Sequence, residues 1–121
     1  MGKQMSFSKL ERKFSPSVRE KVNNAENVYD LEKNFAVVVN NFLQEAMKEE
    51  NFEITGETIQ FKPEEDDHFF IEKKLKNNKV FKEIWENSDL KNVIKRFADS
   101  AYHRYLHLEK HNEKTNKKIR N

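Results

Sequence analysis

The stretch Ser88–His111, SDLKNVIKRFADSAYHRYLHLEKH, carries the clearest helical pattern in the sequence. Ser88 is a good N-cap because its hydroxyl can accept a hydrogen bond from an unpaired backbone N–H of the first turn. Asp89 adds negative charge near the positive end of the helix dipole. At about 100° per residue one broad face is apolar, which predicts a core helix over residues 89–111. That face comprises Val93, Ile94, Phe97, Ala98, Ala101, Tyr105 and Leu108.

The residues that precede this helix carry further helical patterns. Residues 31–50 hold a second strong apolar stripe, and we expect this helix to pack against the one over 89–111. Ser15 followed by Pro16 is typical of a helix start and predicts a helix over 16–28. A shorter apolar pattern predicts a helix over about 79–87. The stripe of the 31–50 helix comprises Leu31, Phe35, Val38, Val39, Phe42, Leu43, Ala46 and Met47.

The period of the pattern changes from helical to alternating at residues 52–62. Apolar residues alternate with polar ones on both sides of Gly56, which predicts a β-hairpin with its turn at Thr55–Glu57. One free edge of this hairpin could pair with a strand of a partner. Pro63 then predicts the start of another helix, whose first turn would hold the acidic residues 64–67, where they favour the helix dipole.

The composition indicates one mainly α-helical domain. The chain has 121 residues, 14 aromatic side chains among them, and only two Gly and two Pro, which disfavours a loop-rich or all-β fold. We therefore expect a small helical bundle of about five helices with one short β-hairpin, a single domain over 1–121, and frayed or disordered ends at 1–6 and 112–121.

The absence of cysteine and of long apolar runs limits the cellular compartments in which we expect the protein. The sequence contains no Cys, which excludes disulfides and cysteine nucleophiles and fits a reducing compartment such as the cytoplasm. No apolar run approaches the ~20 residues that span a bilayer. The start MGKQMS matches a short pattern for N-myristoylation, but one acyl chain holds a membrane only marginally, so we do not expect membrane association.

Three of the four histidines lie in a row on the predicted 89–111 helix. His103, His107 and His111 follow at intervals of four residues, which stacks them along one side of the helix. Two histidines at this spacing can bind one metal ion. A third ligand could come from Asp99 one turn earlier, or from Asp66, Asp67 or His68 elsewhere in the chain. The row also lies beside two arginines, away from the apolar face, which favours a solvent-exposed surface. No cofactor is expected, and a divalent metal ion is the one alternative.

Charge is unevenly distributed along the chain. Acidic residues predominate over 45–67 and basic residues over 110–121, within a net charge of +2. A basic C-terminal surface could meet the phosphates of a nucleic acid. Self-association through opposite charges explains the same layout. The residues proposed for phosphate contact are Arg96, Arg104, Lys117 and Lys118.

No motif for catalysis is present in the sequence. It lacks a Gly-rich phosphate loop, a nucleophile elbow and a dinucleotide-binding fingerprint. The hypothesis that remains first is a small, non-enzymatic binding or regulatory module that acts by protein–protein contact, as a homo-oligomer or with another protein. It predicts an exposed apolar patch around Trp85, Phe81 or the hairpin. Nucleic-acid binding and metal binding are the two alternatives.

Overall fold

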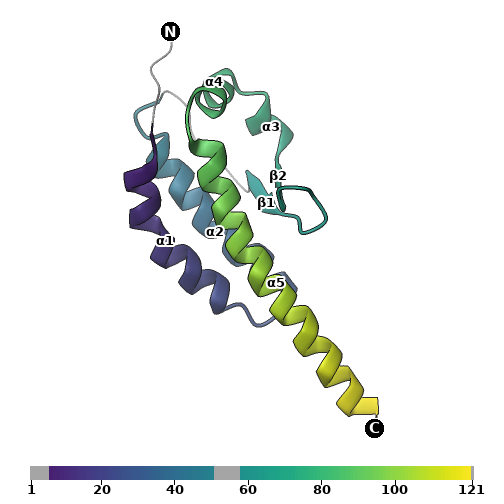
Figure 1. Cartoon of the computed structure of the whole chain (residues 1–121). Helices are drawn as coiled ribbons and strands as arrows, with labels where there is room; N and C mark the ends of the chain where they lie inside the picture. Colours follow the sequence, from purple (N-terminus) through teal and green to yellow (C-terminus); the bar gives the residue numbers. More distant parts are fainter. Residues whose placement is uncertain (1–5, 51–57, 121) are drawn as a thin grey trace.

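The computed structural model describes residues 6–50 and 58–120, with side chains described as far as Lys110. The fold is mainly helical, as predicted, and a two-stranded antiparallel sheet accompanies the helices. Figure 1 shows their arrangement. In chain order the elements are α1 Ser8–Asn23, α2 Val28–Ala46, β1 Ile59–Phe61, β2 Phe69–Ile71, α3 Lys73–Lys76, α4 Lys79–Asn87 and α5 Leu90–Arg120.

Helices α1, α2 and α5 form the centre of the fold. Phe42 of α2 packs edge-on against Phe14 of α1, with ring centroids 5.5 Å apart, and against Phe97 of α5 at 5.1 Å. Edge-to-face pairs of this kind are favourable beyond the area that they bury. The expected packing of the 31–50 and 89–111 helices is confirmed, because both contribute buried residues to one continuous core.

Helix α1 begins earlier than the sequence predicted, and Pro16 lies inside it rather than at its start. The apolar positions explain the difference. Phe7, Leu10 and Phe14 continue in phase with Val18 and Val22, so a single helix buries the whole stripe. Pro16 is exposed and therefore keeps its ring away from the core.

Helix α2 is capped by Asn27, whose Oδ1 accepts a hydrogen bond from the backbone N–H of Asp30 at 2.8 Å. The helix ends at Ala46, whereas the apolar stripe had predicted an end near residue 50. Met47 follows as the C-cap and is still fully buried. Burial of that side chain thus extends the apolar pattern beyond the last helical residue.

The two strands differ from the predicted hairpin. β1 lies within the expected 52–62 range, but its partner is β2, with Gln60 opposite Phe70. The predicted turn at 55–57 lies outside the described residues. The helix expected from Pro63 is wrong: Phe69 and Ile71 alternate with exposed Phe70, so residues 69–71 are a strand with one face toward the core.

The acidic residues 64–67 belong to the loop that joins β1 to β2. The backbone N–H of Lys62 donates to the carbonyl of His68 at 2.9 Å and closes the loop. His68 has a φ of 68°, in the left-handed region. Its ring lies flat on that of Tyr102 of α5, with centroids 3.8 Å apart. This ring contact therefore holds the loop against α5.

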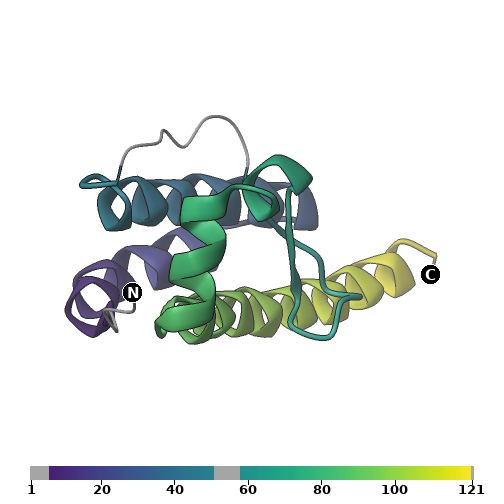
Figure 2. The ribbon, with the colours of Figure 1, turned by 90° about the horizontal axis from the view of Figure 1, so that it is seen from above.

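The sheet lies beside α2 and α5, on the side away from α1 (Figure 2). Phe61 of β1 lies between Phe35 of α2 and Tyr105 of α5, at centroid distances of 5.8 and 6.0 Å. This position brings the outer face of β1 beside the first half of α2, where the candidate site lies.

Helix α4 has the predicted bounds of about 79–87 and closes one end of the bundle. Its N-cap is Asn78, whose Oδ1 accepts from the N–H of Phe81 at 3.0 Å. Phe81 packs on Trp85, and Trp85 packs on Phe69 of β2. The short helix thus contributes to the same core as the sheet.

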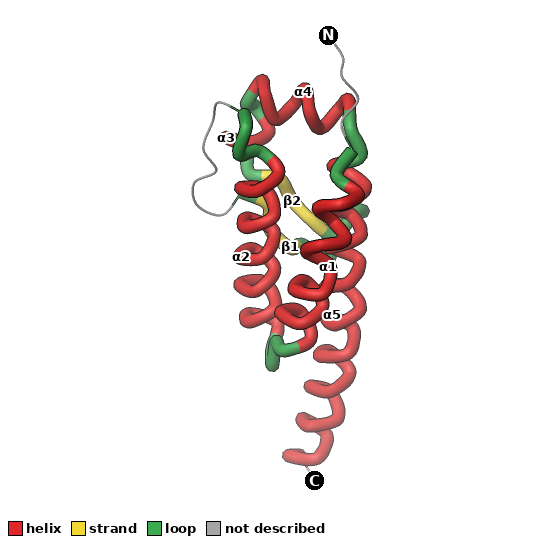
Figure 3. Tube along the Cα trace, turned by 90° about the vertical axis from the view of Figure 1, so that its left-hand side faces the viewer, coloured by secondary structure: helices red, strands yellow, loops and turns green. Residues whose placement is uncertain are grey.

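Helix α5 begins at Leu90, one residue after the predicted start, and its backbone continues to Arg120. Ser88 lies just before it and accepts a hydrogen bond from the N–H of Leu90 at 3.1 Å. The C-terminal part of α5 extends past the loop between α1 and α2 (Figure 3). Fraying of residues 112–121 in solution stays a prediction. No helix in the described part of the chain is long and apolar enough to cross a membrane.

Candidate functional site

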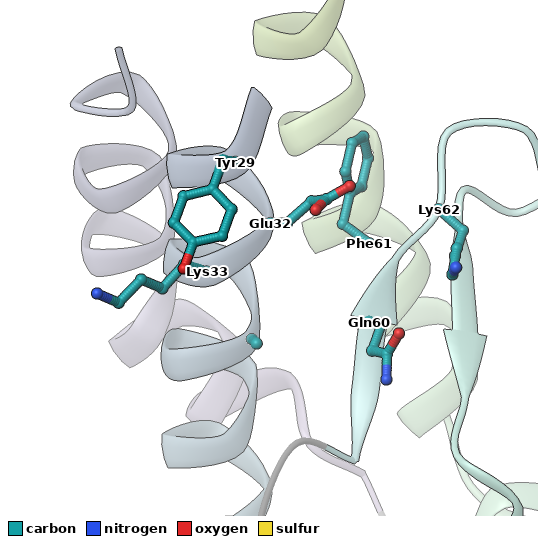
Figure 4. A pocket seen from close by; sticks show the side chains of 7 residues that line it. Tyr29, Glu32, Lys33, Gln60, Phe61 and Lys62 are labelled. Carbon is teal, nitrogen blue, oxygen red and sulfur yellow. The ribbon is translucent and has the colours of Figure 1, made fainter. Parts of the chain in front are cut away.

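A pocket of about 280 Å³ opens between the first half of α2 and strand β1. Helix α2 presents one side of it because residues one turn apart point the same way. Strand β1 supplies the opposite wall (Figure 4). The lining residues are Tyr29, Glu32, Lys33 and Ala36 from α2, and Gln60, Phe61 and Lys62 from β1 and the residue after it.

Exposed apolar side chains occur at this pocket and on the elements next to it. Tyr29 at its rim is 72% exposed, and Val37, one residue beyond Ala36 on α2, is 46% exposed. Phe70, also 46% exposed, lies directly opposite Gln60 on the same outer face of the sheet. We define the docking face as the pocket together with Tyr29, Val37 and Phe70. Three of the four large apolar side chains that are exposed in the described chain lie on it.

The charged groups of the pocket do not converge. The carboxylate of Glu32 points from α2 toward β1, whereas the ammonium of Lys33 points away from β1 and Lys62 lies on the far side of β1 (Figure 4). None of the three forms an ion pair with another described residue. The pocket therefore holds one unpaired carboxylate, and an unpaired lysine extends from its rim.

The outer edge of β1 is closed to a partner strand. In an antiparallel pair, alternate residues direct their backbone groups away from the neighbouring strand. Here the bonds that flank the ladder involve Thr58 and Lys62, so Ile59 and Phe61 direct theirs toward α2. Ile59 is 0% and Phe61 1% exposed. Burial of these two residues argues against strand addition at this edge.

The aromatic residues proposed from the sequence as an interface lie mostly inside the fold. Phe81 is buried in the core, and Trp85 is half-buried with its ring stacked on Phe81 at 5.3 Å. Phe81 has no surface to offer a partner in this conformation. The exposed apolar side chains Tyr29, Val37 and Phe70 lie instead on α2 and β2, outside the places that the sequence had suggested.

The two arginines proposed for phosphate contact have partners within the chain. Arg96 makes two hydrogen bonds to the carboxylate of Glu11, at 2.6 and 2.8 Å. This partner raises the pKa of Arg96 above its usual value, mainly through the hydrogen bond. Arg104 donates to the backbone carbonyl of Ala25. Both guanidinium groups hold α5 against α1 and the residues that follow it.

The histidine row lies on the surface of α5. His103 and His107 are exposed, and so is Asp99. His111, Lys117 and Lys118 lie beyond the residues whose side chains are described. Among the described residues no group of three His, Asp or Glu side chains is placed to hold a metal ion. Metal binding by the full row stays a prediction, and so does phosphate binding by the two lysines.

Beside this row a stack of aromatic rings links the acidic loop to α5. His68 lies on Tyr102, and Tyr102 stacks on Tyr105 with centroids 5.9 Å apart. A hydrogen bond to the carboxylate of Glu109 raises the pKa of Tyr105, and burial adds to the effect. Tyr102 contacts both of the other rings, so the stack positions the loop beside α5.

The residues of the docking face were not predicted from the sequence. Val37 carried the clearest signal, because it is an apolar residue that falls outside the buried stripe of its helix. The exposure of the Phe70 side chain could be predicted only once residues 69–71 were known to form a strand. Comparisons with protein-family models, curated proteins and solved structures find no match for this chain.

Proposed function

We propose that this protein is a small, non-enzymatic interaction module that acts by protein–protein contact and self-associates through the docking face. The observation that carries the proposal is the position of three exposed apolar side chains: Tyr29 lines the pocket, Val37 follows on α2, and Phe70 is paired across the sheet with Gln60 of the pocket. Aromatic and aliphatic side chains beside a pocket are the usual anchors of protein interfaces. Buried area from these side chains would supply the main driving force for association.

The presence of both charges on one face favours a second copy as the partner. A two-fold interface brings the same surface of two molecules together, so each residue type must find its complement within that surface. The docking face supplies exposed apolar groups, a carboxylate in Glu32 and an ammonium group in Lys33. It is therefore complementary to itself.

Light scattering over a series of protein concentrations tests the proposal. We expect the molar mass to approach that of a dimer, and Tyr29→Ser and Phe70→Ser to shift the transition to higher concentration. Leu106→Ser is the matched control, because Leu106 is 43% exposed but lies on α5, outside the docking face. A molar mass that stays at one chain at every concentration would show the proposal to be wrong.

Nucleic-acid binding is the second candidate, and the course of α5 favours it. The backbone of α5 continues to Arg120 beyond the rest of the fold (Figure 3), and residues 110–121 contain five basic side chains and one acidic one. Phosphate binding by such a segment falls steeply as salt rises. Titration of the full chain with a labelled oligonucleotide at two salt concentrations tests it. Binding that is absent or independent of salt would exclude this candidate.

A further inference from the structure

We propose that Lys33 of a second copy enters the pocket and pairs with Glu32, so that two molecules exchange this contact across a two-fold axis. The inference rests on the proposed self-association and specifies its chemistry. Glu32 is the one charged group of the pocket directed between α2 and β1 (Figure 4). Its carboxylate has no ion-pair partner among the described residues.

Of the two lysines of the pocket, Lys33 is the one whose ammonium group is directed outward, where a second molecule can contact it. It is a lining residue of the pocket and is exposed, and its ammonium points away from β1 (Figure 4). Lys62 is half-buried and lies on the other side of β1. An ammonium group directed outward can reach the carboxylate of a facing molecule, and partial burial of the pair would strengthen its attraction relative to water.

The spacing along α2 fits an antiparallel arrangement of the two α2 helices. Tyr29, Lys33 and Val37 follow at intervals of four residues and thus occupy one side of the helix. If two such helices cross near Lys33, Tyr29 of each copy lies opposite Val37 of the other. Lys33 then lies beside Glu32 of the facing helix, and the apolar contacts flank the charged ones.

Charge reversal provides a test in which symmetry predicts the outcome. In Glu32→Lys the contact becomes lysine against lysine, and in Lys33→Glu it becomes glutamate against glutamate. We expect each variant alone to raise the dissociation constant of the dimer at least tenfold. A mixture of the two variants restores opposite charges at both contacts, so the mixed dimer should form with nearly the affinity of the unmodified protein.

The controls exclude a general effect of charge or of stability. Glu20 and Lys21 are adjacent and exposed on α1, outside the docking face, so Glu20→Lys and Lys21→Glu make the same changes in net charge. They should leave association unchanged. Circular dichroism checks that each variant is folded, and Glu32→Gln replaces Glu32→Lys if that variant unfolds. Raising salt from about 0.1 to about 1 M shortens the Debye length from about 10 to about 3 Å and should weaken the dimer.

The possible results separate this inference from the proposed function. Weak single variants and a restored mixture support both. A dimer that forms equally well in the unmodified protein and in both single variants overturns the exchange of Lys33 and leaves the docking face standing. Two weak single variants with no recovery on mixing also overturn the exchange. An unmodified protein that stays a single chain overturns both.

Discussion

The guanidinium of Arg104 on α5 donates two hydrogen bonds to the backbone carbonyl of Ala25, from Nε at 3.2 Å and from Nη2 at 2.7 Å. Ala25 lies two residues beyond the end of α1 and is fully buried. A buried carbonyl without a donor is costly, so this arginine completes the turn between α1 and α2. The same contact places the start of α2, and with it Tyr29 at the rim of the pocket.

Replacement of Arg104 should therefore destabilise the protein. Hydrogen bonds that involve a charged group contribute about 1.5–3 kcal/mol each, and we expect Arg104→Ala to lower the free energy of unfolding by about that amount in total. Arg104→Lys should recover only part, because an ammonium group lacks the planar pair of donors. Urea unfolding measures the differences. Arg19→Ala, at an exposed position of α1, should change stability by less than about 0.5 kcal/mol.

The backbone of His68 leads to a second prediction. A residue other than glycine pays about 1–2 kcal/mol in the left-handed region, where His68 has a φ of 68°. Stacking on Tyr102 offsets this cost in the native protein. Both His68→Ala and His68→Gly lose the stack and the contact of Nδ1 with the carbonyl oxygen of Pro63 at 3.2 Å, but only His68→Ala keeps the backbone cost. We expect the glycine variant to be the more stable of the two by about 1 kcal/mol.

Thermal or urea unfolding of the two variants measures this difference. Tyr102→Ala serves as the companion change, because it removes the stack from the other side and leaves the backbone of His68 unaltered. It should cost more than the roughly 0.5–1.5 kcal/mol of that one ring contact, because Tyr102 also stacks on Tyr105. If His68→Ala proves at least as stable as His68→Gly, the left-handed backbone carries no cost and the explanation is wrong.

Prediction of the fold from sequence succeeded where a long stripe was unambiguous and failed at both prolines. The two long stripes placed α2 and α5 because many positions agree on one face. Pro16 and Pro63 are equally good starts for a helix, and the outcome depended on neighbours in space. Pro16 lies inside α1 because Phe14 and Val18, on either side of it, pack on the same core. Residues 69–71 form a strand because they pair with residues 59–61 of β1 and direct Phe69 toward the core.

The docking face could not be predicted for a related reason. Its members come from α2 and from two short strands, and only the packing of β1 beside α2 brings them together. Helical periodicity identifies the buried face of α2 but does not say which exposed residues gain neighbours. The histidine row and the arginines were visible in the sequence because they lie on one helix, and the arginines proved to be bound to α1 and to Ala25.

Asp89 joins the starts of two helices and gives a third prediction. Its carboxylate accepts from the backbone N–H of Phe7 at 2.7 Å and from the hydroxyls of Ser6 and Ser8 at 3.2 and 3.4 Å. Asp89→Ala leaves these donors at the start of α1 without that acceptor, and we expect a loss of about 1–3 kcal/mol in unfolding free energy. Asp89→Asn keeps an acceptor and should lose less.

Urea unfolding checks the change, and hydrogen exchange locates it. The amide of Phe7 should exchange faster in Asp89→Ala, while amides in the middle of α2 should follow the global stability alone. Asp99→Ala on the exposed face of α5 is the control and should have little effect. An unchanged exchange rate at Phe7 would show that the bond to Asp89 does not hold the start of α1 in solution.

Tyr105 provides a prediction about pH. Its hydrogen bond to the carboxylate of Glu109 raises the pKa of the phenol, because ionisation would break the bond and place two negative charges side by side. A folded-state pKa above the unfolded value, about 10 for tyrosine, means that the stabilisation is complete below about pH 10. It is then lost as pH rises through the folded-state pKa.

Near-ultraviolet titration measures this pKa, with Tyr105→Phe used to assign the transition. We expect Glu109→Gln to lower the pKa of Tyr105, since the amide can still accept a hydrogen bond but carries no charge. Glu86→Gln, at an exposed position of α4, should leave the transition where it is. A transition that does not move in Glu109→Gln would mean that burial, the second cause, dominates instead.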